Sequence, residues 1–96
     1  MKTYSLEFNV QAPKEWDGLD KTVKEQFIKV LRKRLIEPHI PAARLSKELS
    51  NCYKIKLLKL GYRLVYEVSD SRVVVVVISV GKRDRFDAYL RANRRL

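Results

Sequence analysis

Two residue types on which small enzymes and secreted domains often depend are almost missing from this sequence. Its 96 residues include one cysteine, Cys52, and one histidine, His39. A lone cysteine cannot form an internal disulfide, and this pair is too few for a zinc site. We therefore expect a protein that carries no metal or other cofactor and works in a reducing, cytoplasmic setting.

Long apolar runs are missing as well. No apolar stretch approaches the ~20 residues that a membrane-spanning helix needs. Lys2 and Glu7 interrupt the first apolar stretch, which is therefore unlike a signal peptide. We expect no membrane partner and a mature protein that comprises the whole chain.

Acidic residues are outnumbered by basic ones. The chain has 21 Lys and Arg against 11 Asp and Glu, which gives a net charge of +10 and a pI near 10.0. An excess of this size favours a polyanionic partner, with nucleic acid ahead of an acidic protein or an anionic membrane. A basic surface that is only solvated is the simpler alternative.

The first part of the chain is predicted to form a strand and two helices. Apolar and polar residues alternate over Tyr4–Phe8, which predicts a strand. Pro13 suits the first turn of a short helix, and Asp17-Gly18 suits its end. A long amphipathic helix then ends at Glu37 before Pro38. Its apolar residues recur at helical spacing: Val23, Phe27, Val30, Leu31 and Leu35.

The rest of the chain is predicted to form three strands and one helix. We interpret Pro38–Asn51 as a loop with a turn of helix around Leu45. Cys52–Tyr66 alternates on both sides of a glycine and predicts a hairpin. The unbroken β-branched run Arg72–Val80 predicts a central strand that is buried on both faces. A short C-terminal helix follows, with one apolar stripe: Phe86, Tyr89 and Leu90.

This order of elements predicts one α+β domain over residues 1–96. We expect an antiparallel-rich four-stranded sheet packed by the N-terminal helices, with the short C-terminal helix added. In the hairpin, Lys54 and Lys56 share the face opposite Tyr53. If the hairpin loop has an even number of residues, Lys56 lies opposite Arg63. Opposed like charges are destabilising, so such a face favours binding of an anion.

The cations of the hairpin and of the strand end are candidates for RNA binding or RNA cleavage. Lys54, Lys56 and Arg63 are joined by Lys82 and Arg83, and Tyr89 is available to stack on a base. RNA supplies its own nucleophile, the 2′-hydroxyl, and a lysine beside other cations can act as the base. Taken alone, the two lysines are more often part of a solvent-exposed or edge-protecting surface, an arginine such as Arg83 is more often a surface loop residue, and Tyr89 is more often packed against the core.

Several strings resemble the RelE family of bacterial toxins from type II toxin–antitoxin pairs. They are "PKEW", "VKEQ", "CYKIKL", "GYRLVY" and "VVVVVISVGKRDR", which together span most of the chain. The resemblance implies a RelE-like fold and an endoribonuclease that cuts messenger RNA in the A site of a translating 70S ribosome without a metal ion. It also implies a RelB-like antitoxin as partner, with operator DNA contacted only through the antitoxin complex.

The resemblance also implies roles for individual residues. Lys54 and Lys56 match the paired lysines of the family, with Lys56 as general base. Arg63 matches the arginine that holds the scissile phosphate, Arg83 the one that supports the leaving group, and Tyr89 the C-terminal tyrosine that orients a nucleotide.

Further contacts to RNA or the ribosome are expected from Arg44, Lys47, Lys59, Lys82 and Arg85. Ser46, in "RLS", stands where the family has an arginine. Two alternatives to the enzyme are a non-catalytic RNA- or ribosome-binding module and a basic structural subunit of a larger assembly.

Overall fold

The computed structural model describes residues 3–45, 51–82 and 87–95, without the side chains of Asp87 and Tyr89. The elements are β1 (Ser5–Phe8), α1 (Ala12–Asp17), α2 (Lys21–Ile36), the 3₁₀ turn η1 (Pro41–Ala43), β2 (Cys52–Leu57), β3 (Tyr62–Ser69), β4 (Val74–Lys82) and α3 (Asp87–Arg95). This is the predicted order, with η1 in place of a turn around Leu45. Within the described ranges, no helix has the length and apolarity to cross a bilayer.

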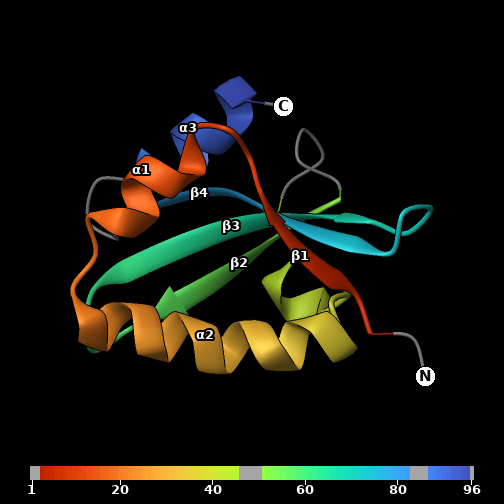
Figure 1. Cartoon of the computed structure of the whole chain (residues 1–96), viewed down its shortest axis with the longest axis horizontal. Coiled ribbons are helices and arrows are strands. Elements are labelled where there is room, and N and C mark those ends of the chain that lie inside the picture. Colours follow the sequence, from red (N-terminus) through yellow and green to blue (C-terminus); the bar gives the residue numbers. More distant parts are fainter. Residues whose placement is uncertain (1–2, 46–50, 83–86, 96) are drawn as a thin grey trace.

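The sheet is four-stranded with the order β1-β4-β3-β2 (Figure 1). β4 pairs with β3 antiparallel and with β1 parallel, and β2 and β3 form the predicted hairpin. The prediction of an antiparallel-rich sheet is therefore confirmed, although the β1–β4 pair makes the sheet mixed. The valine-rich run forms β4, which lies between β1 and β3 and is therefore a central strand. Both faces of β4 are covered, as its pattern indicated.

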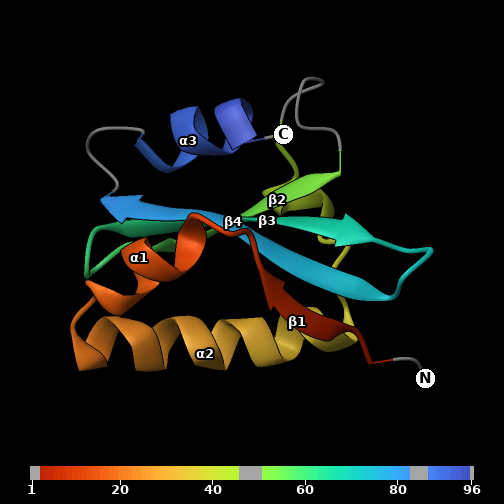
Figure 2. The same ribbon diagram turned by 45° about the horizontal axis from the view of Figure 1, so that its top comes forward.

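Helices cover the two faces unequally. Figure 2 shows α2 on one face of the sheet and α3 on the other. The main core lies on the α2 face and includes Phe27 and Leu31 of α2 with Tyr66, Val77 and Val80 of the sheet. The smaller core under α3 consists of Cys52, Val65, Ile78, Ala88 and Ala92.

The prediction that Leu90 belongs to a buried apolar stripe of the C-terminal helix is wrong, because Leu90 is 58 % exposed. Ala88 and Ala92 face the sheet instead and are fully buried. Successive residues of a helix are ~100° apart, so a helix that buries positions 88 and 92 turns position 90 toward solvent. Phe86 and the side chain of Tyr89 lie outside the described part of the chain.

An irregularity in β4 controls which side chains reach which face. Val65 pairs with Ser79 but Tyr66 pairs with Val77, so Ile78 is an extra residue in β4. Such a β-bulge shifts the alternation of side chains by one position. Val77 and Val80 therefore both belong to the main core, whereas Ile78 belongs to the core under α3.

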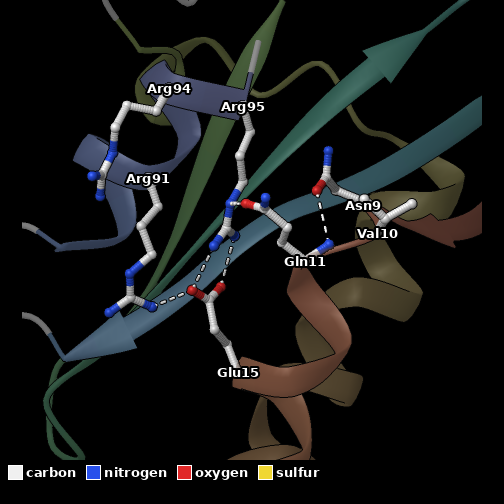
Figure 3. A pocket seen from close by; sticks show the side chains of 7 residues that line it. All are labelled: Asn9, Val10, Gln11, Glu15, Arg91, Arg94 and Arg95. Atoms are coloured by element: carbon white, nitrogen blue, oxygen red, sulfur yellow. Dashed lines mark hydrogen bonds and ion pairs between the residues drawn. The ribbon is translucent and has the colours of Figure 1, made fainter.

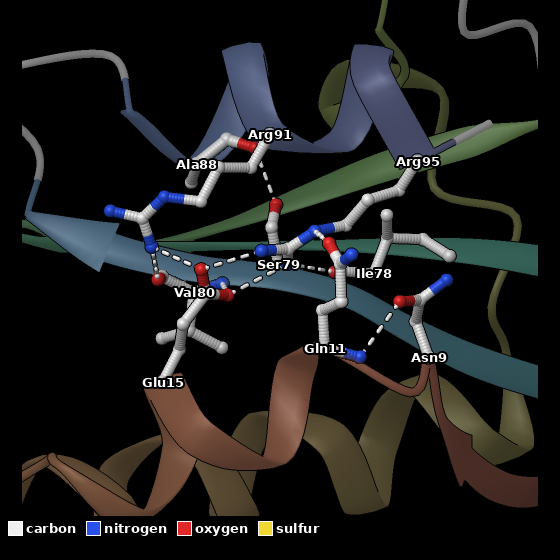
Figure 4. A network of polar contacts seen from close by, with 9 residues as sticks. All are labelled: Asn9, Gln11, Glu15, Ile78, Ser79, Val80, Ala88, Arg91 and Arg95. Atoms are coloured by element: carbon white, nitrogen blue, oxygen red, sulfur yellow. Dashed lines mark hydrogen bonds and ion pairs between the residues drawn. The ribbon is translucent and has the colours of Figure 1, made fainter.

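Beyond Val77, the outer edge of β4 is not paired with β1, and three side chains bond to it instead (Figure 4). Glu15 Oε1 accepts a hydrogen bond from Val80 N at 3.1 Å. Arg91 Nη1 donates to Val80 O at 2.9 Å, and Arg95 Nη1 donates to Ile78 O at 2.7 Å. Backbone N–H and C=O groups at this edge, which could otherwise pair with a strand of another molecule, thereby have hydrogen-bond partners.

The same three side chains bond to one another. Arg95 donates to both carboxylate oxygens of Glu15 at 2.9 Å, and Arg91 Nη1 also donates to this carboxylate. We call Glu15, Arg91 and Arg95 the Glu15 clamp. Burial would raise the pKa of Glu15, but hydrogen bonds from Arg95, Val80 N and Arg91 outweigh it, so the pKa lies below its ordinary value of 4.5.

We predict that Glu15→Gln loses about 2 kcal/mol of unfolding free energy at pH 7, because the clamp loses its charge-assisted hydrogen bonds. Since the folded state lowers the pKa of Glu15, its contribution is present above pH 4.5 and is lost as pH falls through the lowered value. Urea unfolding of both proteins from pH 7 to pH 3 measures the difference. A difference that stays constant over this range would contradict the assignment.

We predict that Phe27→Ala destabilises the protein by about 3–5 kcal/mol, because Phe27 is fully buried beside Trp16 and truncation leaves a cavity. The neighbouring Ile28 is 38 % exposed, and Ile28→Ala serves as control with an expected loss below about 1 kcal/mol. Urea denaturation measures both. Equal losses for the two variants would show that the main core is placed wrongly.

Candidate functional site

The hairpin brings three cations to the face of the sheet that carries α3. Four loop residues connect β2 to β3, so Leu57 pairs with Tyr62 and Lys56 pairs with Arg63. The even loop length, on which the pairing of Lys56 with Arg63 depended, is thus present. Lys54 lies two positions before Lys56 on the same strand and shares its face. We call Lys54, Lys56 and Arg63 the cationic face.

Two rows of paired residues define the surroundings of this face. Lys56, Arg63 and Gly81 form one row across β2, β3 and β4. The glycine presents no side chain beside the arginine. Lys54, Val65 and Ser79 form the next row, and Ser79 Oγ donates to the carbonyl oxygen of Ala88 in α3. The first turn of α3 therefore lies next to the cationic face.

Burial differs among the three cations. Arg63 is only 9 % exposed, whereas Lys54 is half-buried and Lys56 is exposed. A guanidinium that is buried among its neighbours has little freedom to reorient, and an exposed ammonium can contact a ligand directly. Glu67 lies on the same face of β3 but four residues from Arg63, roughly 13 Å along the strand. Within β2 and β3, the three cations thus form a patch without an interposed acid.

The structure does not bring Lys82 to this face. Lys82 pairs with Tyr62, whose ring packs against the main core, and it lines a hollow with Lys14 and Leu19 on the side of α1. The extra residue in β4 explains the difference, because plain alternation from Val77 would have placed Lys82 on the α3 face. The expectation that Lys82 joins the cluster is therefore wrong in position.

The other predicted site residues are only partly placed. Lys59, in the hairpin loop, lines a hollow together with Lys56. Arg44 lies at the end of η1, and its backbone forms an isolated antiparallel β-bridge with Tyr53. The remaining candidates, with the family difference at Ser46, lie outside the described residues: Lys47, Arg83, Arg85 and the side chain of Tyr89.

A larger hollow of about 670 Å³ lies elsewhere, between α3 and the start of α1 (Figure 3). Arg91, Arg94 and Arg95 line it together with Glu15. Figure 3 shows Arg91 and Arg95 directed at the carboxylate of Glu15. The charges of Arg91 and Arg95 are therefore partly neutralised by the ion pairs with Glu15. This hollow is a weaker candidate for anion binding than the cationic face.

His39 takes part in a separate polar cluster. Its Nδ1 lies 2.8 Å from the hydroxyl oxygen of Tyr53 and its Nε2 lies 2.8 Å from Oδ1 of Asp70. Tyr53 belongs to the main core, on the face opposite Lys54. His39 is therefore not a partner of the cationic face. In the part of the chain that the structure describes, no three His, Cys, Asp or Glu residues are grouped as metal ligands.

The Glu15 clamp was missed by the interpretation of the sequence. Arg91 and Arg95 are four residues apart and so share one side of a helix, which was the only local signal. Their partner lies 76 and 80 residues away along the chain. No short motif records a contact of this kind.

Comparisons with known proteins agree with the geometry. Residues 6–85 match the model of a family described as the ParE toxin of a type II toxin–antitoxin system, parDE. The chain is 50 % identical to the mRNA interferase toxin RelE of Escherichia coli K12 over 93 residues, which covers 97 % of each sequence.

Solved structures of the Escherichia coli toxin RelE give the same result. A doubly substituted form in the free state has a TM-score of 0.89 and 48 % identity over 98 % of each chain. The toxin in the intact RelBE toxin–antitoxin complex has a TM-score of 0.79 and 53 % identity, covering 82 % of this chain and 95 % of that one. With this identity, coverage and fold, the chain belongs to the RelE family of type II toxin–antitoxin toxins.

Proposed function

We propose that this protein is a ribosome-dependent endoribonuclease that cuts messenger RNA in the A site and so stops translation. The observation that carries the proposal is the pairing of Lys56 with Arg63 on a face shared with Lys54. Such a patch fits the charge of a phosphodiester. The name of the relative that is 50 % identical, an mRNA interferase toxin, supports the same activity.

The reaction is an attack by the ribose 2′-oxygen on the adjacent phosphorus. The bond from phosphorus to the 5′-oxygen of the next nucleotide breaks, which leaves a 2′,3′-cyclic phosphate and a 5′-hydroxyl. Lys56 removes the 2′-proton, and Arg63 donates hydrogen bonds to the phosphate oxygens as negative charge accumulates on them. Lys54 adds a second positive charge on the same side.

A lysine can serve as base here because other cations stand close to it. Arg63 is its cross-strand partner and Lys54 is two residues away, and nearby like charge favours the neutral amine. In this mechanism the charge is stabilised by side chains, so the protein needs no metal ion of its own. Arg83 supports the departing 5′-oxygen and donates the proton that makes it a 5′-hydroxyl late in bond breaking, then regains a proton from water. Tyr89 orients a nucleotide by stacking.

We also propose a RelB-like antitoxin as the partner that restrains the toxin, with operator DNA contacted only through that complex and action in the cytoplasm, where ribosomes are. A relative at 53 % identity is solved as an intact toxin–antitoxin complex. The small core under α3 is consistent with a partner that competes for this face, because Ala88 and Ala92 bury little apolar area.

We predict that Lys56→Ala lowers cleavage at least 100-fold while ribosome affinity changes less than about threefold, because a base is lost but only one of many charges. Lys29→Ala is the matched control, since Lys29 is exposed on α2 and its loss removes the same charge elsewhere. Primer extension on messenger RNA, either naked or on ribosomes with an empty A site, detects the cuts.

Two outcomes of this experiment separate the candidates. Ribosome-dependent cuts within the A-site codon that persist in Lys29→Ala and vanish in Lys56→Ala support the enzyme. Salt-sensitive ribosome binding with no cuts for the natural sequence would replace it with a non-catalytic RNA-binding module.

We predict a different result for Lys82→Ala. Because Lys82 faces α1 rather than the cationic face, its loss should raise KM by no more than about threefold through weaker long-range attraction and leave kcat unchanged. Steady-state cleavage kinetics separate the two constants. A tenfold fall in kcat would mean that Lys82 reaches the reacting phosphate.

A further inference from the structure

Glu15 joins three elements that are far apart in the sequence. It extends from α1, accepts a hydrogen bond from the backbone of β4 at Val80, and binds Arg91 and Arg95 of α3 (Figure 4). Its side chain is 15 % exposed, and that of Arg95 is 11 % exposed. The contacts are therefore largely shielded from water. Ion pairs in such a shielded place are stronger than ion pairs at the surface.

The elements joined by Glu15 are the ones that carry two of the proposed catalytic groups. Tyr89 belongs to α3, between Ala88 and the clamp residue Arg91. Arg83 follows directly after Lys82, the last residue of β4. The clamp thus binds the helix that contains Tyr89 and the strand that Arg83 follows in the sequence.

The described apolar contacts of α3 are made by small side chains. Among the side chains of α3 that the structure describes, the buried apolar ones are Ala88 and Ala92, which bury small areas and have no rotamers to interlock. Ser79 Oγ binds the carbonyl oxygen of Ala88 at the first turn. Arg91 and Arg95 fix the following turns through Glu15 and the edge of β4. Without the carboxylate, Arg91 and Arg95 keep their hydrogen bonds to carbonyl oxygens of β4, and Arg95 keeps one to Gln11 Oε1 at the start of α1. The charged group that links both arginines to α1 is lost.

We propose that Glu15 is a positioning residue of the cleavage reaction, which holds α3 and the end of β4 so that Tyr89 and Arg83 meet the RNA correctly. This role rests on the proposed function. Glu15 does not touch the substrate. A carboxylate is required because its two oxygens accept four hydrogen bonds: Oε1 accepts from Val80 N and Arg95, and Oε2 accepts from Arg95 and Arg91. A glutamine offers one acceptor oxygen and two N–H donors that face arginines.

A double-mutant cycle with Tyr89 tests the proposal. The proteins are the natural sequence, Glu15→Gln, Tyr89→Ala and the double variant, assayed for cleavage on A-site-empty ribosomes well below their unfolding temperatures. Glu7→Gln is the matched control, because Glu7 makes an exposed ion pair with Arg72 on another part of the sheet. We expect Glu15→Gln to lower kcat at least tenfold, to leave KM within twofold, and to have less than a twofold effect when Tyr89 is already absent.

Amide hydrogen exchange provides a readout that needs no activity. In Glu15→Gln, the amides of α3 should exchange at least tenfold faster, and the amides of β2 and β3 should speed up by no more than the factor that the predicted loss of unfolding free energy allows, whereas Glu7→Gln changes neither. Glu15→Asp, which keeps the charge on a shorter side chain, should recover part of the lost kcat.

Three results would overturn the proposal. Equal kcat for Glu15→Gln and the natural protein would do so, as would a fall in kcat that is just as large without Tyr89. Unchanged exchange of the α3 amides in Glu15→Gln would show that the carboxylate does not hold this helix. If the natural protein itself does not cut RNA, the proposed function fails and the positioning role fails with it, and this result is distinct from the other three.

Discussion

Burial of β4 on both faces is the constraint on which the rest of this structure depends. A strand without a polar face has to be covered twice, and the chain meets this requirement with α2 on one side and α3 on the other. The cover under α2 is wide and rich in large side chains. Among the described side chains of α3, the buried apolar ones are Ala88 and Ala92, and Arg91 and Arg95 add hydrogen bonds to Glu15 and to the edge of β4.

The cationic face follows from a second constraint, the register of the hairpin. With four loop residues, Lys56 has to lie opposite Arg63, although like charges across a strand pair are unfavourable. In the proposed function, a phosphate of the RNA substrate binds to these cations and offsets their mutual repulsion. The register places the three cations on one face of a hairpin, and this fixed arrangement is what the proposed reaction needs to orient its substrate.

Local patterns predicted most of the fold. The helix over Lys21–Ile36 and the hairpin were predicted correctly because helical and strand periodicities are expressed within a few residues. The position of Lys82 was not, since one extra residue at Ile78 shifts the alternation and nothing in the run of valines marks it. The buried face of α3 was missed because Leu90 is more hydrophobic than the two alanines that pack.

The site was predictable to the same extent. Lys54, Lys56 and Arg63 lie within one hairpin, so charge and strand alternation were enough to predict that they share a face. Glu15 was beyond such reasoning, because its partners belong to the other end of the chain and no periodicity connects them. Family resemblance identified the toxin, but the contacts that hold α3 come from the folded structure.

The most direct test of the account concerns the nucleophile. Messenger RNA with a single 2′-deoxyribonucleotide at the cleavage position, presented on ribosomes with an empty A site, removes the attacking hydroxyl and nothing else. The account predicts that the cut at that position disappears, and that the downstream fragment from unmodified RNA begins with a 5′-hydroxyl. A cut that persists in the deoxy-substituted RNA, or a downstream fragment with a 5′-phosphate, would show that water rather than the ribose attacks the phosphate.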